Sequence, residues 1–154
     1  MTPVSSRLRG DRGTVGGIEA LPFGVLVFVV GSLLTANAWA VVDVKLAVTS
    51  ASREAVRRYV EASDHDRAVN EATVVARDAI RSHGRDPDRA HLRIDHAGGR
   101  PWGRCTRVTM TVSYPVPALS LPWIGGYGDA FEVRADHSEI VDPFRAGLPG
   151  ASRC

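Results

Sequence analysis

The hydrophobic pattern divides the chain into one long apolar run and a mixed, mostly polar remainder. Residues 20–42 are 23 consecutive positions without Asp, Glu, Lys, Arg or His. At 1.5 Å per helical residue the run spans roughly 35 Å, enough to cross a hydrocarbon core of about 30 Å. The 112 residues that follow are too few and too polar to enclose such a helix. We therefore predict a transmembrane helix over residues 19–42.

The helical pattern continues beyond the apolar run, which predicts one helix over about residues 17–62 that becomes amphipathic after residue 42. The apolar stripe of this second part is Val44, Val48, Ala51, Ala55, Tyr59 and Ala62. The segment SDHD at 63–66 offers N-cap residues, and Gly84 suits the position after a helix. A second helix is predicted over 66–83. Its apolar face is Val69, Ala72, Val75, Ala76, Ala79 and Ile80.

The period then changes from three or four to two, which is typical of half-buried strands. The alternating apolar positions are Leu92 and Ile94, then Val108, Met110, Val112 and Tyr114, then Phe131, Val133 and Ala135. Pro115 and Pro117 are expected to end the second strand. Residues 118–128 read as an apolar loop and residues 137–150 as a tail. The prediction is an α+β domain over 43–154, with about three antiparallel strands packed on helix and carried on a membrane stalk.

A cleaved signal peptide is the alternative to a retained anchor. Two A-x-A patterns, at 36–38 and 38–40, could direct cleavage near Ala38 or Ala40 and release a soluble, exported binding module. The apolar run exceeds the usual 7–15 residues of a signal peptide, and the helical pattern continues through it. Both features favour the retained anchor.

Charge sets the expected topology and excludes one class of partner. Arg7, Arg9 and Arg12 precede the apolar run, and short basic tails stay on the cytoplasmic side. Residues 1–18 are therefore expected in the cytoplasm, and residues 43–154 outside the plasma membrane. Beyond residue 42 the chain has 16 Lys and Arg against 15 Asp and Glu. Such a balance argues against binding to nucleic acid, which requires a basic stripe.

No catalytic constellation is found. His91, His96 and His137 share no metal-ligand spacing, and satisfied surface histidines are the better interpretation. Strand alternation would direct His137 and Ser138 to opposite faces, so they cannot act together as base and nucleophile. We expect no enzymatic activity, no metal, no cofactor and no small-molecule substrate.

Three further features are candidates for assembly or stability. Small residues recur every seven positions at Gly17, Gly24, Gly31 and Ala38. This spacing favours close helix packing in a membrane, although small residues are common in such helices anyway. Cys105 and Cys154 either pair in an exported domain or remain free thiols; pairing closes a loop of about 50 residues and contributes on the order of 4 kcal/mol. The loop around Trp123, Ile124 and Tyr127 is a partner patch, a membrane-grazing edge or a flap over the sheet.

Three segments resemble TadE/TadF-like proteins of the tight-adherence (Flp) pilus system, of the actinobacterial type. They are DRGTVGGIEALPFGVLVFVVGSLL at 11–34, ANAWAVVD at 36–43 and ADHSEIVDPFRAGLPG at 135–150. The resemblance implies a non-catalytic membrane protein that assembles a Tad/Flp pilus or secretion apparatus, or enters it as a minor pseudopilin. Its implied partners are the lipid bilayer and other proteins of that apparatus, reached through the membrane helix and the outer domain.

In type IV pilin-like proteins a peptidase cuts after a glycine, and a glutamate at the fifth mature position neutralises the new amine of a neighbouring subunit. An ammonium and a carboxylate in lipid are each costly alone, and pairing offsets much of that cost. The resemblance implies Gly13 before the cut, Thr14 as first mature residue and Glu19 as the counter-charge. Glu19 is the sixth residue from Thr14, one too many. Processing and a fixed, unprocessed anchor, with Glu19 favouring the first helical turn, both remain open.

Overall fold

The computed structural model describes residues 16–121, 123–128, 130–150 and 153–154. Side chains are described from residue 20 onwards. Gly13 and Thr14 lie outside the described residues. The chain divides into two compact units, Met1–Ala36 and Asn37–Cys154, each of which is considered by itself.

One helix, α1 (Gly16–Glu61), crosses from the first unit into the second. It confirms the single helix predicted over residues 17–62. Within the first unit the described part of α1 has no buried side chain. Within the second unit the same helix is amphipathic, and every member of the predicted stripe from Val44 to Ala62 is buried.

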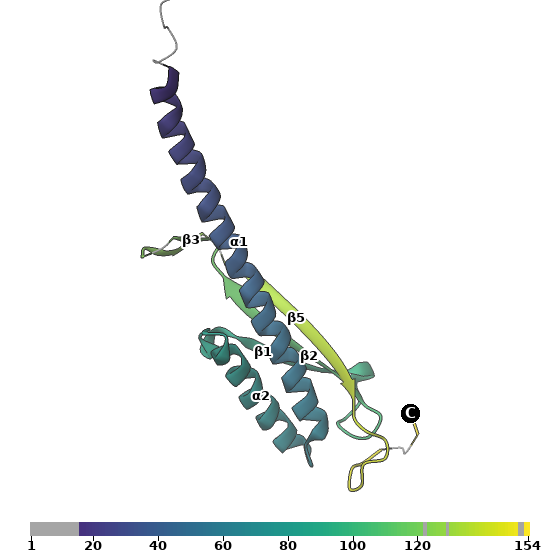
Figure 1. Ribbon diagram of the computed structural model, residues 1–154. Coiled ribbons are helices and arrows are strands. Elements are labelled where there is room, and N and C mark those ends of the chain that lie inside the picture. The colour runs from purple at the N-terminus through teal and green to yellow at the C-terminus, as the bar shows by residue number, and fades with distance from the viewer. Residues whose placement is uncertain (1–15, 122, 129, 151–152) are drawn as a thin grey trace, which may run out of the picture. The chain divides into compact units, whose positions relative to one another are not determined.

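The second unit is a two-layer α+β domain (Figure 1). After α1 come α2 (His65–Ser82), the short 3-10 helices η1 (Pro87–Arg89) and η2 (Ala97–Gly99), and a three-stranded sheet. Strands β1 (His91–His96), β2 (Arg107–Val116) and β5 (Phe131–Ile140) are antiparallel in the order β1-β2-β5. Asp64 begins α2 as its N-cap: its Oδ1 accepts the Arg67 N–H at 2.9 Å. The predicted fold class is therefore confirmed.

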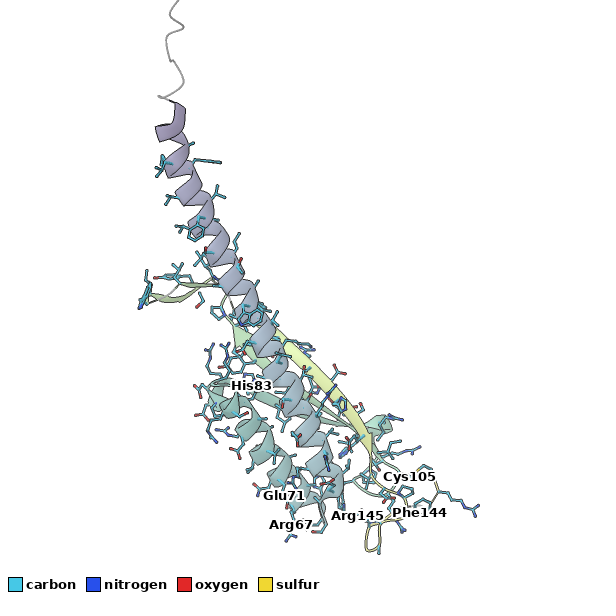
Figure 2. All side chains as sticks on the ribbon, viewed as in Figure 1. Arg67, Glu71, His83, Cys105, Phe144 and Arg145 are labelled. Carbon is cyan, nitrogen blue, oxygen red and sulfur yellow. A yellow bond between two sulfur atoms is a disulfide. The ribbon has the colours of Figure 1, made fainter. Side chains whose placement is uncertain are left out.

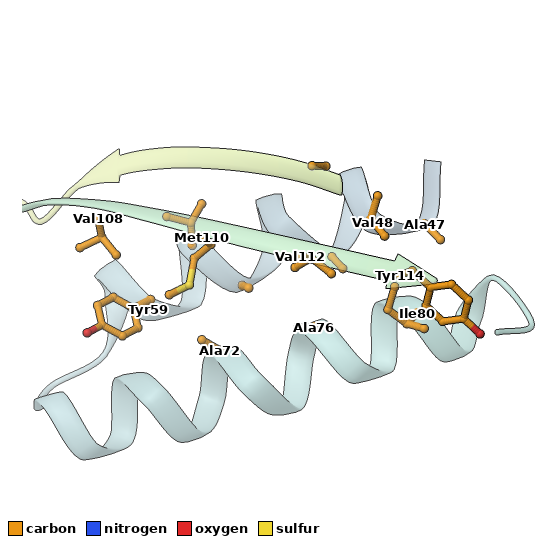
Figure 3. Packing of buried hydrophobic residues seen from close by; sticks show 14 of the residues in the cluster. Ala47, Val48, Tyr59, Ala72, Ala76, Ile80, Val108, Met110, Val112 and Tyr114 are labelled. Atoms are coloured by element: carbon orange, nitrogen blue, oxygen red, sulfur yellow. The ribbon is translucent and has the colours of Figure 1, made fainter. Parts of the chain in front are cut away.

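Both helices cover one face of the sheet, and the core lies between them (Figure 3). Small residues on α2 and bulkier ones on β2 let the layers approach closely. The buried members of these two elements are Ala68, Ala72, Ala76 and Ile80, and Val108, Met110, Val112, Tyr114 and Val116. The opposite face of the sheet is polar: Thr109 and Ser138 are register partners there, with their hydroxyl oxygens 2.7 Å apart.

Several boundaries differ from the sequence predictions. Strand β2 does not stop at Pro115 but continues to Val116. Strand β1 begins opposite Ser113, so beyond that point β2 has a neighbour on one side only, where a proline is tolerated. Strand β5 extends to Ile140, through part of the expected tail, because Arg107 to Val116 of β2 pair with it throughout.

The expected apolar loop at 118–128 contains a separate hairpin. Strand β3 (Leu119–Leu121) pairs with β4 (Gly125–Tyr127) and with neither β2 nor β5. Figure 1 shows this hairpin standing away from the three-stranded sheet. The period-two signal is too short for sequence reasoning to recognise here, since each strand has three residues.

Candidate membrane anchor and assembly surface

The apolar helix is exposed along its membrane-length part. A single candidate membrane span is found in the described residues, within Ala20–Glu61, and none of its most apolar 18-residue window is buried inside the protein. Phe28 is 74% exposed and Phe23 is 68% exposed. A core helix would bury such side chains, so that interpretation fails. A signal sequence near the N-terminus meets the same criteria of length and composition.

The small residues of α1 leave open space around the helix. A Cβ atom added to Gly24 or Gly31 would meet nothing within 4 Å. Ala38, in the second unit, is exposed. Gly17 and Glu19 lie in the first turn of α1, and their side chains are outside the description. No contact within the described chain therefore accounts for Gly24 and Gly31.

Asn37 fastens the β3–β4 hairpin to α1. Its Nδ2 donates to the carbonyl oxygen of Ser120 at 3.1 Å, and the Ser120 N–H donates to its Oδ1 at 2.6 Å. Asn37 belongs to the apolar run by sequence and to the second compact unit by structure. In the sequence Asn37 is recognisable only as part of an A-x-A pattern, because a contact across 83 residues leaves no local signal.

A pocket of about 420 Å³ lies at the base of this hairpin. Its lining includes Asn37 and Ala40 of α1 and two guanidinium groups, those of Arg85 and Arg89. Arg85 Nη2 is 2.6 Å from an oxygen of Asp43. Arg89 donates to the Pro115 carbonyl oxygen at 3.3 Å and lies 5.4 Å from the centre of the Tyr114 ring. The hairpin base therefore carries the positive charge of Arg89 beside the apolar helix, while the charge of Arg85 is paired with that of Asp43.

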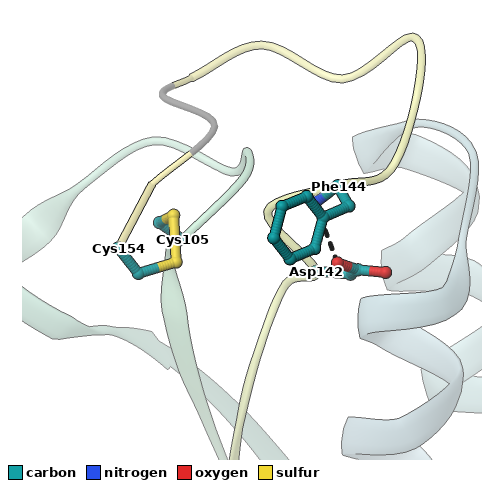
Figure 4. Close-up of a disulfide and its surroundings, with 4 residues drawn as sticks. All are labelled: Cys105, Asp142, Phe144 and Cys154. Carbon is teal, nitrogen blue, oxygen red and sulfur yellow. Dashed lines mark hydrogen bonds between the residues drawn. A yellow bond between two sulfur atoms is a disulfide. The ribbon is translucent and has the colours of Figure 1, made fainter.

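The other end of the domain is closed by a disulfide. Cys105 and Cys154 are bonded, with their Cα atoms 5.2 Å apart (Figure 4). The tail also pairs with the segment before β2: Cys105 N–H donates to Val141 O and Val141 N–H donates to Thr106 O, both at 3.0 Å. Leu148 is buried in the core. The residues expected to form a tail are thus a folded part of the domain.

Arg145 joins this tail to the end of α1 (Figure 2). Its guanidinium donates to the carbonyl oxygens of Val60, at 2.8 Å, and Glu61. The last carbonyls of a helix have no partner within the helix, and positive charge is favourable there. Arg145 therefore caps α1 from a distance of 85 residues in sequence.

An aromatic cluster lies near the same end. Tyr59 is fully buried, and its hydroxyl is 2.9 Å from His96 Nε2. Burial raises the pKa of Tyr59, because the charged phenolate is poorly solvated there. The rings of His65 and Trp102 lie against the cluster, with their centroids 6.3 Å apart. The geometry explains His96 as a hydrogen-bond partner of a core tyrosine.

The histidines considered in the sequence analysis are distributed over the sheet. His91 and His96 lie at opposite ends of β1, and His137 lies on β5, across β2 from it. His137 pairs with Met110, and Ser138 pairs with Thr109 on the opposite face. Among the residues that the structure describes, no three His, Cys, Asp or Glu side chains gather as a metal site.

Beside the disulfide lies a pocket of about 580 Å³. Arg100, Arg104 and Arg153 line it, and the Nε atom of Arg104 is buried with no hydrogen-bond partner among the described residues. Guanidinium groups bind carboxylates and phosphates, so this end of the domain has room and charge for an acidic group.

Comparisons of the chain with protein-family models, curated proteins and solved structures find no match.

Proposed function

We propose that this protein is a single-pass membrane protein that acts in assembly of a Tad/Flp-type pilus or secretion apparatus, or as a minor pseudopilin of it. Residues 19–42 span the plasma membrane, residues 1–18 face the cytoplasm, and residues 43–154 form a non-catalytic domain outside. The observation that carries the anchor is an exposed apolar helix that continues without a break into the core of a folded domain.

The exposed apolar surface favours lipid over water. The large apolar side chains of this part of α1 that are at least 46% exposed are Leu21, Phe23, Val25, Leu26, Val27, Phe28, Val29, Val30 and Leu34. Burying one such side chain is worth roughly 1.5–3 kcal/mol, so together they favour insertion by more than about 10 kcal/mol. Between its terminal turns a helix pairs all of its backbone groups internally, which a bilayer requires.

The disulfide supports the proposed orientation. Bonds such as Cys105–Cys154 form and persist in oxidising compartments and are rare in the cytoplasm. The basic tail at 1–18 and the disulfide-bonded domain therefore favour opposite sides of the membrane.

Asn37 supports retention of the anchor. Cleavage near Ala38 or Ala40 would remove Asn37 and both of its hydrogen bonds to Ser120. It would leave the hairpin unfastened and the first turn of the compact unit missing. The alternative function remains an exported, soluble binding module released by such cleavage.

The pilus assignment rests on the sequence resemblance, and the structure adds a physical basis for a structural role. Gly24 and Gly31 leave room for a second membrane helix, and the arginine-lined pocket has room for an acidic group of a partner. The partners in this proposal are the lipid bilayer, like helices and other Tad/Flp assembly proteins.

Membrane extraction and mass spectrometry of the mature chain test the anchor. We expect the protein to resist alkaline carbonate extraction and to yield a peptide that runs through residues 36–43 intact. A mature chain that starts at Trp39 or Val41 would instead establish the soluble module. The same mass spectra show whether the Gly13–Thr14 peptide bond has been cleaved. An intact bond would indicate a fixed anchor, and a new N-terminus at Thr14 would indicate pilin-like processing.

Deletion and complementation in the source cells test the assembly role. We expect loss of surface filaments on deletion, recovery with the wild-type chain and poor recovery with Glu19→Gln. Glu54→Gln, at an exposed position of α1 outside the apolar run, is the matched control and should restore filaments. Unchanged filaments after deletion would remove the pilus proposal while leaving the anchor intact.

A further inference from the structure

The β3–β4 hairpin exposes apolar and aromatic side chains that the rest of the domain does not cover. Trp123 at its tip is 103% exposed, Ile124 is 67% exposed and Tyr127 is 50% exposed. Every residue from Gly125 to Gly128 is exposed. A two-stranded hairpin is marginally stable in water, so contact with something outside the chain would add to the support that Asn37 gives it.

Trp123 lies in the turn of this hairpin, where its fully exposed side chain contributes no buried apolar surface to the fold. The Ile124 N–H donates to the Leu121 carbonyl oxygen, and Trp123 between them has a positive φ of 64°. That backbone conformation suits glycine or asparagine and is costly for a bulky residue. A strained and fully exposed tryptophan indicates an external ligand for its side chain.

Charge and position decide the kind of ligand. Residues 108–128 contain no Asp, Glu, Lys, Arg or His, so the hairpin carries no charge for pairing with a polar partner. Its base is fixed by Asn37 to the last turns of the apolar run, within the same compact unit. Two residues further along α1, Trp39 is 72% exposed. The base of the hairpin therefore lies at the end of the apolar run, close to the exposed Trp39.

The backbone groups of the β3–β4 hairpin limit how deeply it can lie in the bilayer. The outer edges of a two-stranded sheet carry N–H and C=O groups outside the ladder. Asn37 pairs with those of Ser120, and the hydrocarbon core does not tolerate groups that remain unpaired. The headgroup layer supplies water and polar groups for those edges, and tryptophan and tyrosine are enriched there. Figure 1 shows the hairpin running crosswise to the part of α1 from which it departs.

We propose that the β3–β4 hairpin is a membrane foot: Trp123, Ile124 and Tyr127 lie in the lipid headgroup layer beside the end of the membrane span. This inference rests on the proposed anchor function. The foot and α1 hold the domain at two points, which restricts its rotation about the helix axis. Arg89, which lines the pocket at the hairpin base, would supply a positive charge for the phosphates of that layer, while Arg85 is paired with Asp43.

Fluorescence quenching in bilayers tests the foot. The full chain is placed in phosphatidylcholine vesicles that carry bromine at shallow or deep acyl positions. Trp39→Phe is compared with Trp39→Phe/Trp123→Phe, so that subtraction isolates the emission of Trp123 from that of Trp102. We expect blue-shifted Trp123 emission that shallow bromine quenches by about half or more and deep bromine quenches less.

The control places a tryptophan at the far end of the domain. Phe144 is 85% exposed beside Arg145, which reaches Glu61. From Asn37 to Glu61 the helical rise is about 36 Å, well beyond the headgroup layer. Phe144→Trp in the Trp39→Phe/Trp123→Phe background should emit as a water-exposed indole and escape quenching by either lipid.

Flotation of the same vesicles distinguishes failure of the proposed anchor from failure of the proposed membrane foot. A chain that does not float contradicts the anchor itself. A chain that floats while Trp123 emits as in water overturns the foot alone. A blue shift that appears only at high protein density and is insensitive to bromine would assign the hairpin to a second copy of the chain, which also overturns it.

The variant Trp123→Gly provides a second, independent test of the membrane foot. Glycine adopts a positive φ readily, so the turn persists and the unfolding midpoint in detergent should be unchanged or higher. In bilayers, amides of residues 119–127 should lose the protection from hydrogen exchange that the wild-type chain shows. Equal protection in both chains contradicts a role for the Trp123 side chain in lipid.

Discussion

Single polar side chains connect parts of this domain that are far apart in sequence. Tyr59 and His96 meet across the core, Asn37 holds Ser120, and Arg145 holds the end of α1. Each satisfies a donor or acceptor that would otherwise be costly to bury or to leave open. Removal of any one of these side chains is therefore expected to lower the free energy of unfolding.

Tyr59→Phe removes the hydroxyl and keeps the ring. We expect a loss of about 1 kcal/mol in the free energy of unfolding, because the bond to His96 Nε2 disappears while packing is retained. Chemical denaturation of the full chain in detergent micelles measures it. Tyr127→Phe, on the exposed hairpin, is the matched control and should leave the midpoint unchanged; an equal effect of both changes would contradict this assignment.

The N-cap of α2 should make stability sensitive to acid. The backbone N–H of Arg67, followed by the Ser63 hydroxyl, lowers the pKa of Asp64 below its ordinary value of 3.8. Because the unfolded chain takes up the proton first, this contribution is complete above the ordinary value and is lost as the pH falls through the lower folded value. Far-UV circular dichroism of the full chain from about pH 5 to pH 2 follows the loss.

Asp64→Asn is the informative comparison, because asparagine caps a helix without titrating. Its α2 signal should remain flatter over the same range. Glu132, whose pKa is lowered by a hydrogen bond from Ser113 and then by Arg134, continues to titrate in both chains. An identical acid response in the two chains would show that Asp64 carries none of it.

At the scale of elements, hydrophobic periodicity places each helix and strand, and tertiary contacts set their limits. The stripe from Val44 to Ala62 is buried as its spacing predicts, since residues three and four apart share a helix face. Strand β5 runs past its predicted end because β2 offers partners as far as Arg107. The partners of Asp136 to Ile140 lie more than twenty positions away, at Thr111 to Arg107, so the local sequence carries no information about them.

The disulfide should hold the tail against the start of β2. The double change Cys105→Ser/Cys154→Ser removes a cross-link over a separation of 49 residues. In the chain-entropy model the free energy of unfolding falls by up to about 4 kcal/mol. Denaturation in micelles measures the fall, and thiol labelling of the unreduced wild-type chain should find no free cysteine. Two labelled cysteines would show that the bond does not form in cells.

The open space at Gly24 and Gly31 should matter only to a neighbouring helix. A Cβ atom added at either position meets nothing within 4 Å, so leucine at both positions should not lower the unfolding midpoint. Self-association in bilayers, measured by energy transfer between labelled chains, should weaken because the helices can no longer approach closely. Val29→Leu, about 200° around the helix from Gly31, is the control and should associate normally.

For the whole molecule, the proposed orientation makes a direct prediction. Alkaline phosphatase fused after Cys154 should be active, because that enzyme requires export. A cytoplasm-dependent fluorescent protein fused at the same place should be dark. The reverse pattern would place the domain in the cytoplasm and remove the argument from the disulfide.

The sequence by itself determined the apolar run, both helices, the three main strands and the faces that each element buries. These features depend on neighbours within a few residues, where periods of 3.6 and 2 are decisive. Only the tertiary structure decided that Asn37 fastens a hairpin, that Arg145 caps α1 and that the apparent tail completes the core. Those contacts join residues 83 and 85 positions apart, and no local pattern encodes such pairs. The chain alone therefore indicates a membrane helix with an α+β domain, and the fold exposes the hairpin that we assign to the membrane surface.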